Sequence, residues 1–83
     1  MEFTKVKLES TYNEKTRETT NSDEEFEVII EDLIYNTPVV MMELLNFKPI
    51  RFGILRDLIQ DKKRLAVKTD VAIYEFKILW ERA

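Results

Sequence analysis

The sequence predicts one small α+β domain, with an N-terminal strand, two to three helices and a C-terminal antiparallel pair of strands. Three patterns carry this prediction: alternation near the start, helical spacing of apolar residues in the middle, and a second alternating run at the end. The chain has 83 residues, 45% of them hydrophobic, which is the size of a single domain. We therefore expect residues 1–83 to fold around one core.

The first strand is predicted over residues 2–12. Val6 and Leu8 share one side of this segment if it is extended, while charged residues occupy the other side. Residues 13–22 include no apolar side chain and have nothing to bury. We expect them to form an exposed, flexible loop.

The C-terminal pair is predicted over residues 65–68 and 71–80. Tyr74, Phe76 and Trp80 share one face of the last strand, and its other face is largely apolar as well. We therefore expect this strand to be central or covered by helices, with the three aromatic side chains in the core.

The first helix is predicted over residues 23–35. Ser22 and Glu25 have the spacing of a capping box, and apolar side chains follow three and four residues apart. The alternative is a strand over residues 24–34, because apolar residues also alternate with glutamates there. The pattern favours the helix and leaves the strand open.

A second helix is predicted over residues 38–46, where Thr37 fits an N-cap and the proline after it fits the first helical position. This segment is apolar nearly all round, which favours burial. An exposed Met41 and Met42 would instead indicate a docking surface for a homodimer. A third, amphipathic helix is predicted over residues 52–64.

The chemistry of most enzymes is absent from the sequence. It has no histidine, no cysteine and one glycine, which excludes nucleophile–histidine pairs, His/Cys zinc sites and glycine-rich phosphate loops. Asp57 and Asp61, four residues apart, are typical of a solvated helix face. The prediction is a protein that is not an enzyme and that holds no metal and no cofactor.

Charge is divided unevenly: residues 1–47 carry four basic and eleven acidic side chains, while residues 48–83 carry nine basic and five acidic ones. Carboxylates on a rigid element can imitate a run of phosphates. The leading hypothesis is therefore a small acidic protein-binding module that docks an acidic face on a basic, nucleic-acid-binding partner protein. In style, though not in sequence, such a protein is similar to the inhibitors and antitoxin-like regulators of phages and mobile elements. The predicted contact residues are Asp23, Glu24, Glu27, Glu31 and Asp32.

The alternative hypothesis is a winged-helix-like regulator that binds DNA or RNA through the basic C-terminal half. The predicted helix 52–64 would then enter a groove of the nucleic acid, and the residues after it would form the wing. A pI near 5.0 and two aspartates on that helix count against this alternative. Its contact residues would be Arg51, Arg56, Lys62, Lys63, Arg64 and Lys68.

We expect the protein to act in the cytoplasm, away from membranes. The absence of cysteine is typical of a reducing compartment. The first residues show no basic segment followed by an apolar run, so no signal peptide is predicted. No apolar stretch approaches the roughly 20 residues that span a bilayer.

Overall fold

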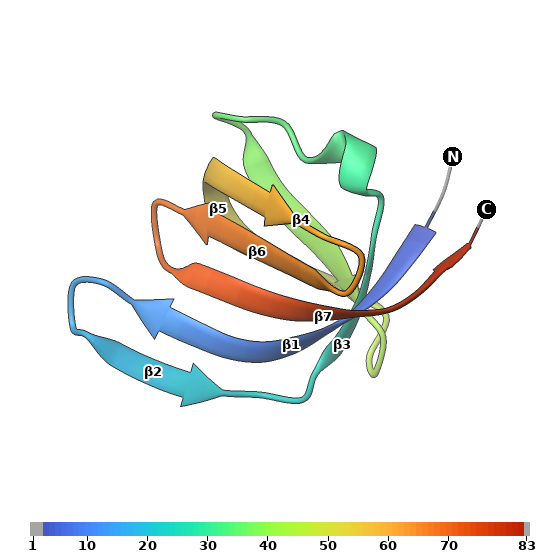
Figure 1. Cartoon of the computed structure of the whole chain (residues 1–83), viewed down its shortest axis with the longest axis horizontal. Coiled ribbons are helices and arrows are strands. Elements are labelled where there is room, and N and C mark those ends of the chain that lie inside the picture. Colours follow the sequence, from blue (N-terminus) through green and yellow to red (C-terminus); the bar gives the residue numbers. More distant parts are fainter. Residues whose placement is uncertain (1–2, 83) are drawn as a thin grey trace.

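Seven strands in one antiparallel sheet make up most of the computed structural model, which describes the backbone of residues 3–82 and the side chains of residues 3–80 (Figure 1). One 3-10 turn, η1 (Ile30–Asp32), is the only helical element in this part of the chain. The predicted α+β class is therefore wrong, and the fold is all-β. The strands are β1 (Phe3–Asn13), β2 (Glu18–Asn21), β3 (Glu25–Val28), β4 (Pro38–Glu43), β5 (Lys48–Gln60), β6 (Arg64–Thr69) and β7 (Ile73–Arg82).

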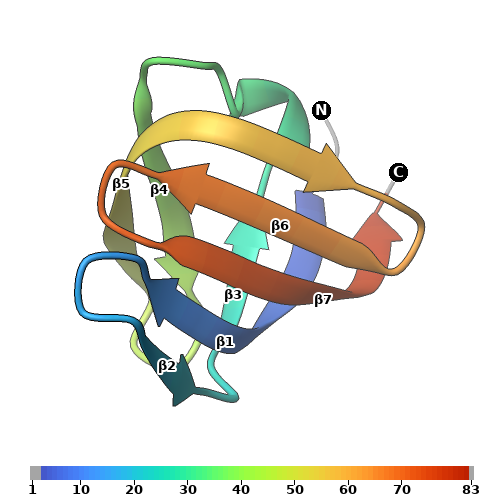
Figure 2. The same cartoon turned by 60° about the vertical axis from the view of Figure 1, so that its left-hand side comes forward.

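The sheet closes on itself at β1. This strand pairs with β7 along one edge and with β3 and then β2 along the other. From β3 to β7 each strand pairs with the next one in the chain. The last strand of this meander, β7, pairs with β1, which closes the sheet (Figure 2). The described sheet still has open edges. Two of them are the outer side of β2 and the side of the first half of β4 that faces β3.

The enclosed core is built from side chains that point inward at alternate strand positions. Phe52 packs edge-to-face on Phe26 and Phe76, with ring centroids 5.3 and 5.7 Å apart, and on Tyr74 at 4.8 Å. Phe76 is confirmed as a core residue, Tyr74 is half-buried, and Trp80 is more exposed than predicted. The other buried hydrophobic residues are Val6, Leu8, Val28, Val39, Met41, Leu55, Leu65, Val67 and Ala72.

The strands predicted at the two ends of the chain are confirmed. β1 buries Val6 and Leu8 on one face, and β6 and β7 form the C-terminal antiparallel pair. β7 is also central, because it lies between β6 and β1. Within the segment 13–22, residues 18–21 form β2, whose four side chains are all exposed.

The predicted helices 23–35 and 38–46 are wrong, because most of both segments is extended. In β3, Phe26 and Val28 are buried and alternate with glutamates, so the strand alternative is correct there. In β4, exposed and buried residues alternate over the full length of the strand. The apolar character of this segment, which indicated a buried helix, belongs to a strand whose outer face is apolar as well.

The predicted helix 52–64 is also wrong, because the segment continues β5 and ends in a turn. β5 has two bulges: the ladder with β4 shifts register at Phe52, and the ladder with β6 shifts at Arg56. Each bulge adds one residue to the strand. The core-facing residues Phe52, Leu55 and Leu58 therefore recur at every third position, and this spacing resembles a helix.

Gly53 allows β5 to bend closely past the turn between β6 and β7. Its φ is +116°, and an added Cβ would lie 2.6 Å from Asp70 Oδ1 and 2.8 Å from Thr69 Oγ1. Asp70 Oδ1 also accepts a hydrogen bond from the Ile54 N–H at 2.7 Å. Glycine is favoured here because its φ is positive and because the side chains of Thr69 and Asp70 occupy the space that a Cβ would need.

Candidate functional site

A gap in the sheet separates the first half of β4 from β3. The two strands pair only at Phe26–Glu43 and Glu27–Met42, beyond which β3 ends and the chain enters η1. Backbone groups of every second residue point to the same edge of a strand, so Val40, like Met42, directs its N–H and C=O toward this gap. The described residues place no strand beside Val40 at this edge. The gap is therefore a short, open pairing edge.

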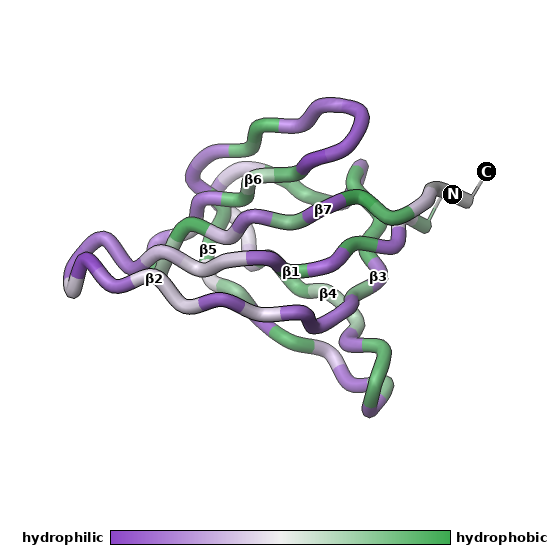
Figure 3. The backbone as a smooth tube through the Cα atoms, turned by 60° about the horizontal axis from the view of Figure 1, so that its bottom comes forward, coloured by the Kyte–Doolittle hydropathy of each residue, from purple (hydrophilic) through white to green (hydrophobic). Residues whose placement is uncertain are grey.

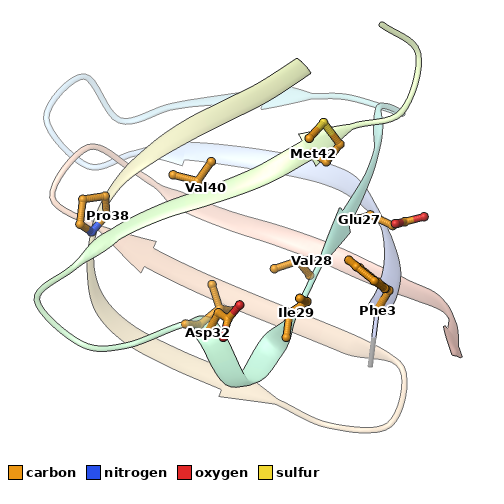
Figure 4. Close-up of a pocket in the computed structure, with 9 residues that line it drawn as sticks. Phe3, Glu27, Val28, Ile29, Asp32, Pro38, Val40 and Met42 are labelled. Carbon is orange, nitrogen blue, oxygen red and sulfur yellow. The ribbon is translucent and has the colours of Figure 1, made fainter. Parts of the chain in front are cut away.

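The gap opens into a groove of about 450 Å³, which we name the β3–β4 groove (Figure 4). One wall is the outer face of β4, with Pro38, Val40 and Met42. The opposite wall comes from β3, η1 and the start of β1. Two of its lining residues, Glu27 and Asp32, are acidic. The remaining ones are Phe3, Val28, Ile29 and Leu33.

The apolar wall of β4 is unusual for the outside of a sheet. An antiparallel sheet that faces water on one side normally carries polar residues there. Val40 and Met42 are instead 45% and 40% exposed, and Pro38 precedes them on the same face. Proline is tolerated at this position because its missing N–H would face the gap, where β4 has no ladder partner. The local sequence thus creates both the open edge and the apolar wall.

Charge beside the groove has both signs, but its lining is acidic. Lys5 lies opposite Glu27 in the ladder of β1 and β3, yet its Nζ pairs with Glu25 Oε1 at 3.2 Å. Arg51 is exposed and lies opposite Val40 on β5. Among the side chains of residues 3–80, no salt bridge engages either acidic lining residue of the groove. Both carboxylates are available to a partner's cation.

The turn between β4 and β5, residues 44–47, presents a second candidate surface, and we name it the apolar turn. It projects beyond the end of β4 (Figure 1). Leu45 and Phe47 are 85% and 76% exposed, which makes them the most exposed large hydrophobic side chains of residues 3–80. Leu45 also lines a hollow of about 360 Å³ that Asp23 and Glu24 share.

Glu43 holds the apolar turn in place from its buried position at the end of β4. Its Oε2 accepts hydrogen bonds from the N–H groups of Leu45 (2.6 Å) and Asn46 (3.0 Å), and its Oε1 accepts one from Asn46 Nδ2 (3.0 Å). The Asn46 N–H is the main cause that holds the pKa of Glu43 below its ordinary value, although desolvation opposes the shift. Phe47, the last turn residue, has a φ of +53°, which is a strained conformation for so large a side chain.

Four of the five acidic residues predicted to form one contact face are divided between two hollows. Glu27 and Asp32 line the β3–β4 groove, whereas Asp23 and Glu24 lie beside the apolar turn. Glu31 is exposed on η1 and lines neither hollow. The structure thus brings four of these residues together in two separate pairs and leaves Glu31 apart from both.

The six basic residues of the nucleic-acid hypothesis do not form one patch of uncompensated charge. Arg64 pairs with Glu9, and Lys68 Nζ lies 3.6 Å from Glu14 Oε1. The winged-helix geometry is excluded, because the segment that should enter a groove of the nucleic acid is a strand. Arg51 and Arg56 lie on β5, Lys62 and Lys63 in the following turn, and Arg64 and Lys68 on β6.

Asp57 and Asp61, predicted to lie on a solvated helix face, lie instead near the end of β5 and in the turn after it. Asp57 Oδ1 accepts a hydrogen bond from the Leu58 N–H at 2.9 Å. Asp61 Oδ1 accepts hydrogen bonds of 2.8 Å from the N–H groups of Lys63 and Arg64. These bonds, chiefly the one from Lys63, lower the pKa of Asp61. Among the described residues, no group of three or more acidic side chains is placed to hold a metal ion. Nor does any helix within residues 3–82 have the length and apolar character needed to cross a membrane.

No protein-family model, no curated protein and no solved structure matches the chain. The functional argument therefore rests on the groove and the turn. Of the docking surface that the sequence offered as an alternative, Met42 is exposed and lines the groove, whereas Met41 is buried. Sequence reasoning missed the groove as a whole and the turn, although each has a signal in the sequence. The outer positions of residues 38–43 are all apolar, and two large apolar residues flank Asn46 in a segment that ends in Lys48.

Proposed function

We propose that the protein is a small protein-binding module whose β3–β4 groove takes up an extended, apolar segment with a basic flank from a partner protein. The observation that carries the proposal is the outer face of β4, where three apolar side chains line an open groove beside an unpaired strand edge. Contiguous exposed apolar surface of this kind favours contact with another molecule.

An extended segment suits the groove because Val40 directs its backbone groups toward it. A partner strand along this edge would exchange main-chain hydrogen bonds with Val40, as in β-strand addition. Its alternate side chains would then lie against Val40 and Met42. The edge is short, so apolar contact contributes more to the affinity than the main-chain bonds do.

A basic flank is favoured by Glu27 and Asp32. Neither forms a salt bridge with another side chain of residues 3–80, so a partner's lysine or arginine would displace no existing ion pair. Arg51, opposite Val40, would repel the same cation, which sets the direction in which the segment lies. Nucleic acid, itself anionic, does not suit this lining.

In this proposal the module acts by occupying the basic surface of another protein, which is how an inhibitor or an antitoxin-like regulator works. The activity requires no catalytic residue. We propose the cytoplasm as the place of action, because a chain without cysteine is typical of a reducing compartment.

Two fluorescent peptides of equal length test the proposal. Both carry the same valine–leucine centre, and one has lysines on its flanks where the other has glutamates. Fluorescence anisotropy should show the lysine peptide binding at least about tenfold more tightly than its glutamate twin. Equal affinities, or no binding of the lysine peptide, would contradict the proposal.

Charge reversal within the acidic set locates the site. The double variant Glu27→Lys with Asp32→Lys should reverse the preference between the two peptides. Its matched control, Glu24→Lys with Glu31→Lys, changes the same net charge outside the groove and should leave the preference unchanged. If the control reverses the preference equally, the peptide reads the overall charge and the groove is not its site.

A further inference from the structure

The apolar turn and the β3–β4 groove carry complementary chemistry on one chain. The turn displays Leu45 and Phe47 to solvent, and Lys48 follows directly and is exposed. This is an apolar segment with a basic flank, the class of ligand that the groove favours. The groove in turn offers apolar walls with Glu27 and Asp32 among its lining residues.

Glu43 makes the apolar turn a preorganised ligand. Its carboxylate already fixes two backbone N–H groups and the Asn46 side chain, so binding would order little further chain. Less of the interaction free energy is then lost to conformational entropy. Phe47 is 76% exposed, so its ring is accessible to a second molecule without any rearrangement of the turn.

One copy cannot bring this turn into its own groove. The outer face of β4 is a wall of the groove, and the turn continues directly from the end of the same strand. The paired ladder with β5 and the bonds of Glu43 hold strand and turn in one arrangement. The contact therefore requires two copies.

We propose that the apolar turn of one copy inserts into the β3–β4 groove of the next, with Leu45 and Phe47 on the apolar wall and Lys48 toward the acidic lining. This inference rests on the proposed function and names its partner as a second copy of this chain. The contact joins two different surfaces, so a pair of bound copies keeps one free groove and one free turn for further copies. Such head-to-tail contacts close into a ring or continue as a filament.

The charges on the two surfaces are compatible with this contact. Beside the turn lie Lys48 and, in the neighbouring hollow, Asp23 and Glu24. Lys5 lies opposite Glu27 of the acidic lining, and Arg51 lies opposite Val40 of the apolar wall. Both surfaces thus carry both signs, so charge sets the orientation of the contact and apolar burial supplies most of its affinity.

Sedimentation velocity of the full chain, from about 10 μM to about 1 mM, tests the inference over the range of weak to moderate affinities. The wild-type chain should form species larger than a dimer. A turn variant, Leu45→Ser with Phe47→Ser, and a groove variant, Val40→Lys, should each remain monomeric. Met42→Lys replaces Val40→Lys if circular dichroism shows that the latter has lost the fold.

Matched controls change exposed apolar residues elsewhere. Ile59→Ser controls for the turn variant and Val71→Lys for the groove variant, because both residues are more than half exposed and lie outside turn and groove. Both control variants should assemble as the wild-type chain does. Loss of assembly in the controls would contradict the assigned contact.

An equimolar mixture of the turn variant and the groove variant provides the sharpest test. The intact groove of the first should take the intact turn of the second, which gives a 1:1 dimer and nothing larger. A wild-type chain that assembles while this mixture stays monomeric would overturn the head-to-tail contact.

Failure of this inference is distinguishable from failure of the proposed function. A wild-type chain that stays monomeric at about 1 mM overturns the inference. If the lysine-flanked peptide still binds such a monomer and the groove variant abolishes that binding, the proposed function stands without self-assembly. If neither association occurs, both are wrong.

Discussion

Two four-residue turns of this protein share one backbone design and differ in what they display. Residues 14–17 join β1 to β2, and the apolar turn joins β4 to β5. In each turn, the side chain of the last residue of the first strand, Asn13 or Glu43, accepts hydrogen bonds. The donors are the backbone N–H groups of the residues two and three positions later in the chain. In each, the last turn residue has a positive φ, +59° at Arg17 and +53° at Phe47.

The side chains of the two turns have opposite character. The β1–β2 turn carries only charged and polar residues, while the apolar turn carries three large hydrophobic ones, and the colours of Figure 3 show the contrast. The anchors differ as well, because Asn13 is neutral and half-buried whereas Glu43 is acidic and buried. A rigid turn is therefore not in itself a binding site. Hydrophobic side chains displayed on such a turn are the feature that indicates a partner.

Exchanging the displayed residues should have the largest effect on assembly. In the graft, Leu44→Glu, Leu45→Lys, Asn46→Thr and Phe47→Arg give the apolar turn the sequence of the β1–β2 turn. We expect the fold to be retained and self-association to weaken by more than about tenfold, the loss that one anchoring side chain causes at an interface. Circular dichroism and sedimentation velocity measure the two quantities.

The reverse graft is the control for this exchange. Placing Leu-Leu-Asn-Phe at residues 14–17 gives the polar graft a new apolar turn at the other hairpin, and self-association should return in part. A polar graft that assembles like the wild-type chain would show that the displayed side chains are not responsible.

Removing the two anchor residues, Asn13 and Glu43, should lower the free energy of unfolding by different amounts. Asn13→Ala is expected to lower the free energy of unfolding by about 0.5–1.5 kcal/mol, the usual contribution of such hydrogen bonds. Glu43→Ala should lower it more, because the carboxylate is buried and its loss leaves two N–H groups and the Asn46 amide without their acceptor. Urea unfolding of both variants measures the difference, and equal losses would contradict a special role for the buried anchor.

Glycine at the positive-φ position of either turn should stabilise the protein by a similar amount, but the two substitutions should differ in their effect on self-association. Arg17→Gly and Phe47→Gly each remove a side chain from a positive-φ position, while glycine also makes the unfolded chain more flexible. The expected net gain is about 0.5–1 kcal/mol in each variant. Only Phe47→Gly should weaken self-association. Thermal unfolding and sedimentation of the pair test this, and weakened assembly in Arg17→Gly would count against the apolar turn.

The sequence predicted those elements that local pattern determines. β1 and β7 follow from alternation. The ladder between them shifts register between Lys5 and Val6 and again between Leu8 and Ser10, but Val6, Leu8 and Phe76 all remain buried in the core. The capping box predicted at Ser22 is wrong as a helix start. Ser22 Oγ instead accepts a hydrogen bond from the Glu24 N–H at 3.2 Å in the irregular segment before β3. Short polar motifs of this kind fit turns and helix starts equally well.

The remaining elements depend on pairing between distant strands. The bulges at Phe52 and Arg56 arise where β5 changes from partner β4 to partner β6, and they turn a strand pattern into an apparent helix pattern. The β3–β4 groove exists because the pairing of these strands stops after Met42, which no local pattern records. Glu27 and Asp32 could be predicted as contact residues from their charge alone. The apolar residues that line the groove with them could be identified only once the pairing of the strands was known.

A change of pH is expected to have the smallest effect on the two turns. It should loosen the turn that Glu43 anchors, because Glu43 titrates, and not the turn that Asn13 anchors. The folded chain holds the pKa of Glu43 below its ordinary value of 4.5, so its stabilisation is fully present above that value and is lost as the pH falls through the lowered folded pKa. Asn13 does not titrate. The apolar turn should therefore be unchanged between about pH 7 and about pH 5 and should loosen only below the ordinary value.

Amide chemical shifts and hydrogen exchange of the two turns, followed from neutral to acidic pH, provide this test residue by residue. The Leu45 and Asn46 amides, which donate to Glu43, should lose their hydrogen-exchange protection at acidic pH, whereas the Lys15 and Thr16 amides, which donate to Asn13, should keep theirs. Asp61, whose pKa is also lowered, adds to acid destabilisation of the whole fold, so a local measurement is needed. Glu43→Gln should remove the difference between the turns. If both turns respond together in the wild-type chain, the charge of Glu43 does not control the apolar turn, and its carboxylate serves only as a hydrogen-bond acceptor.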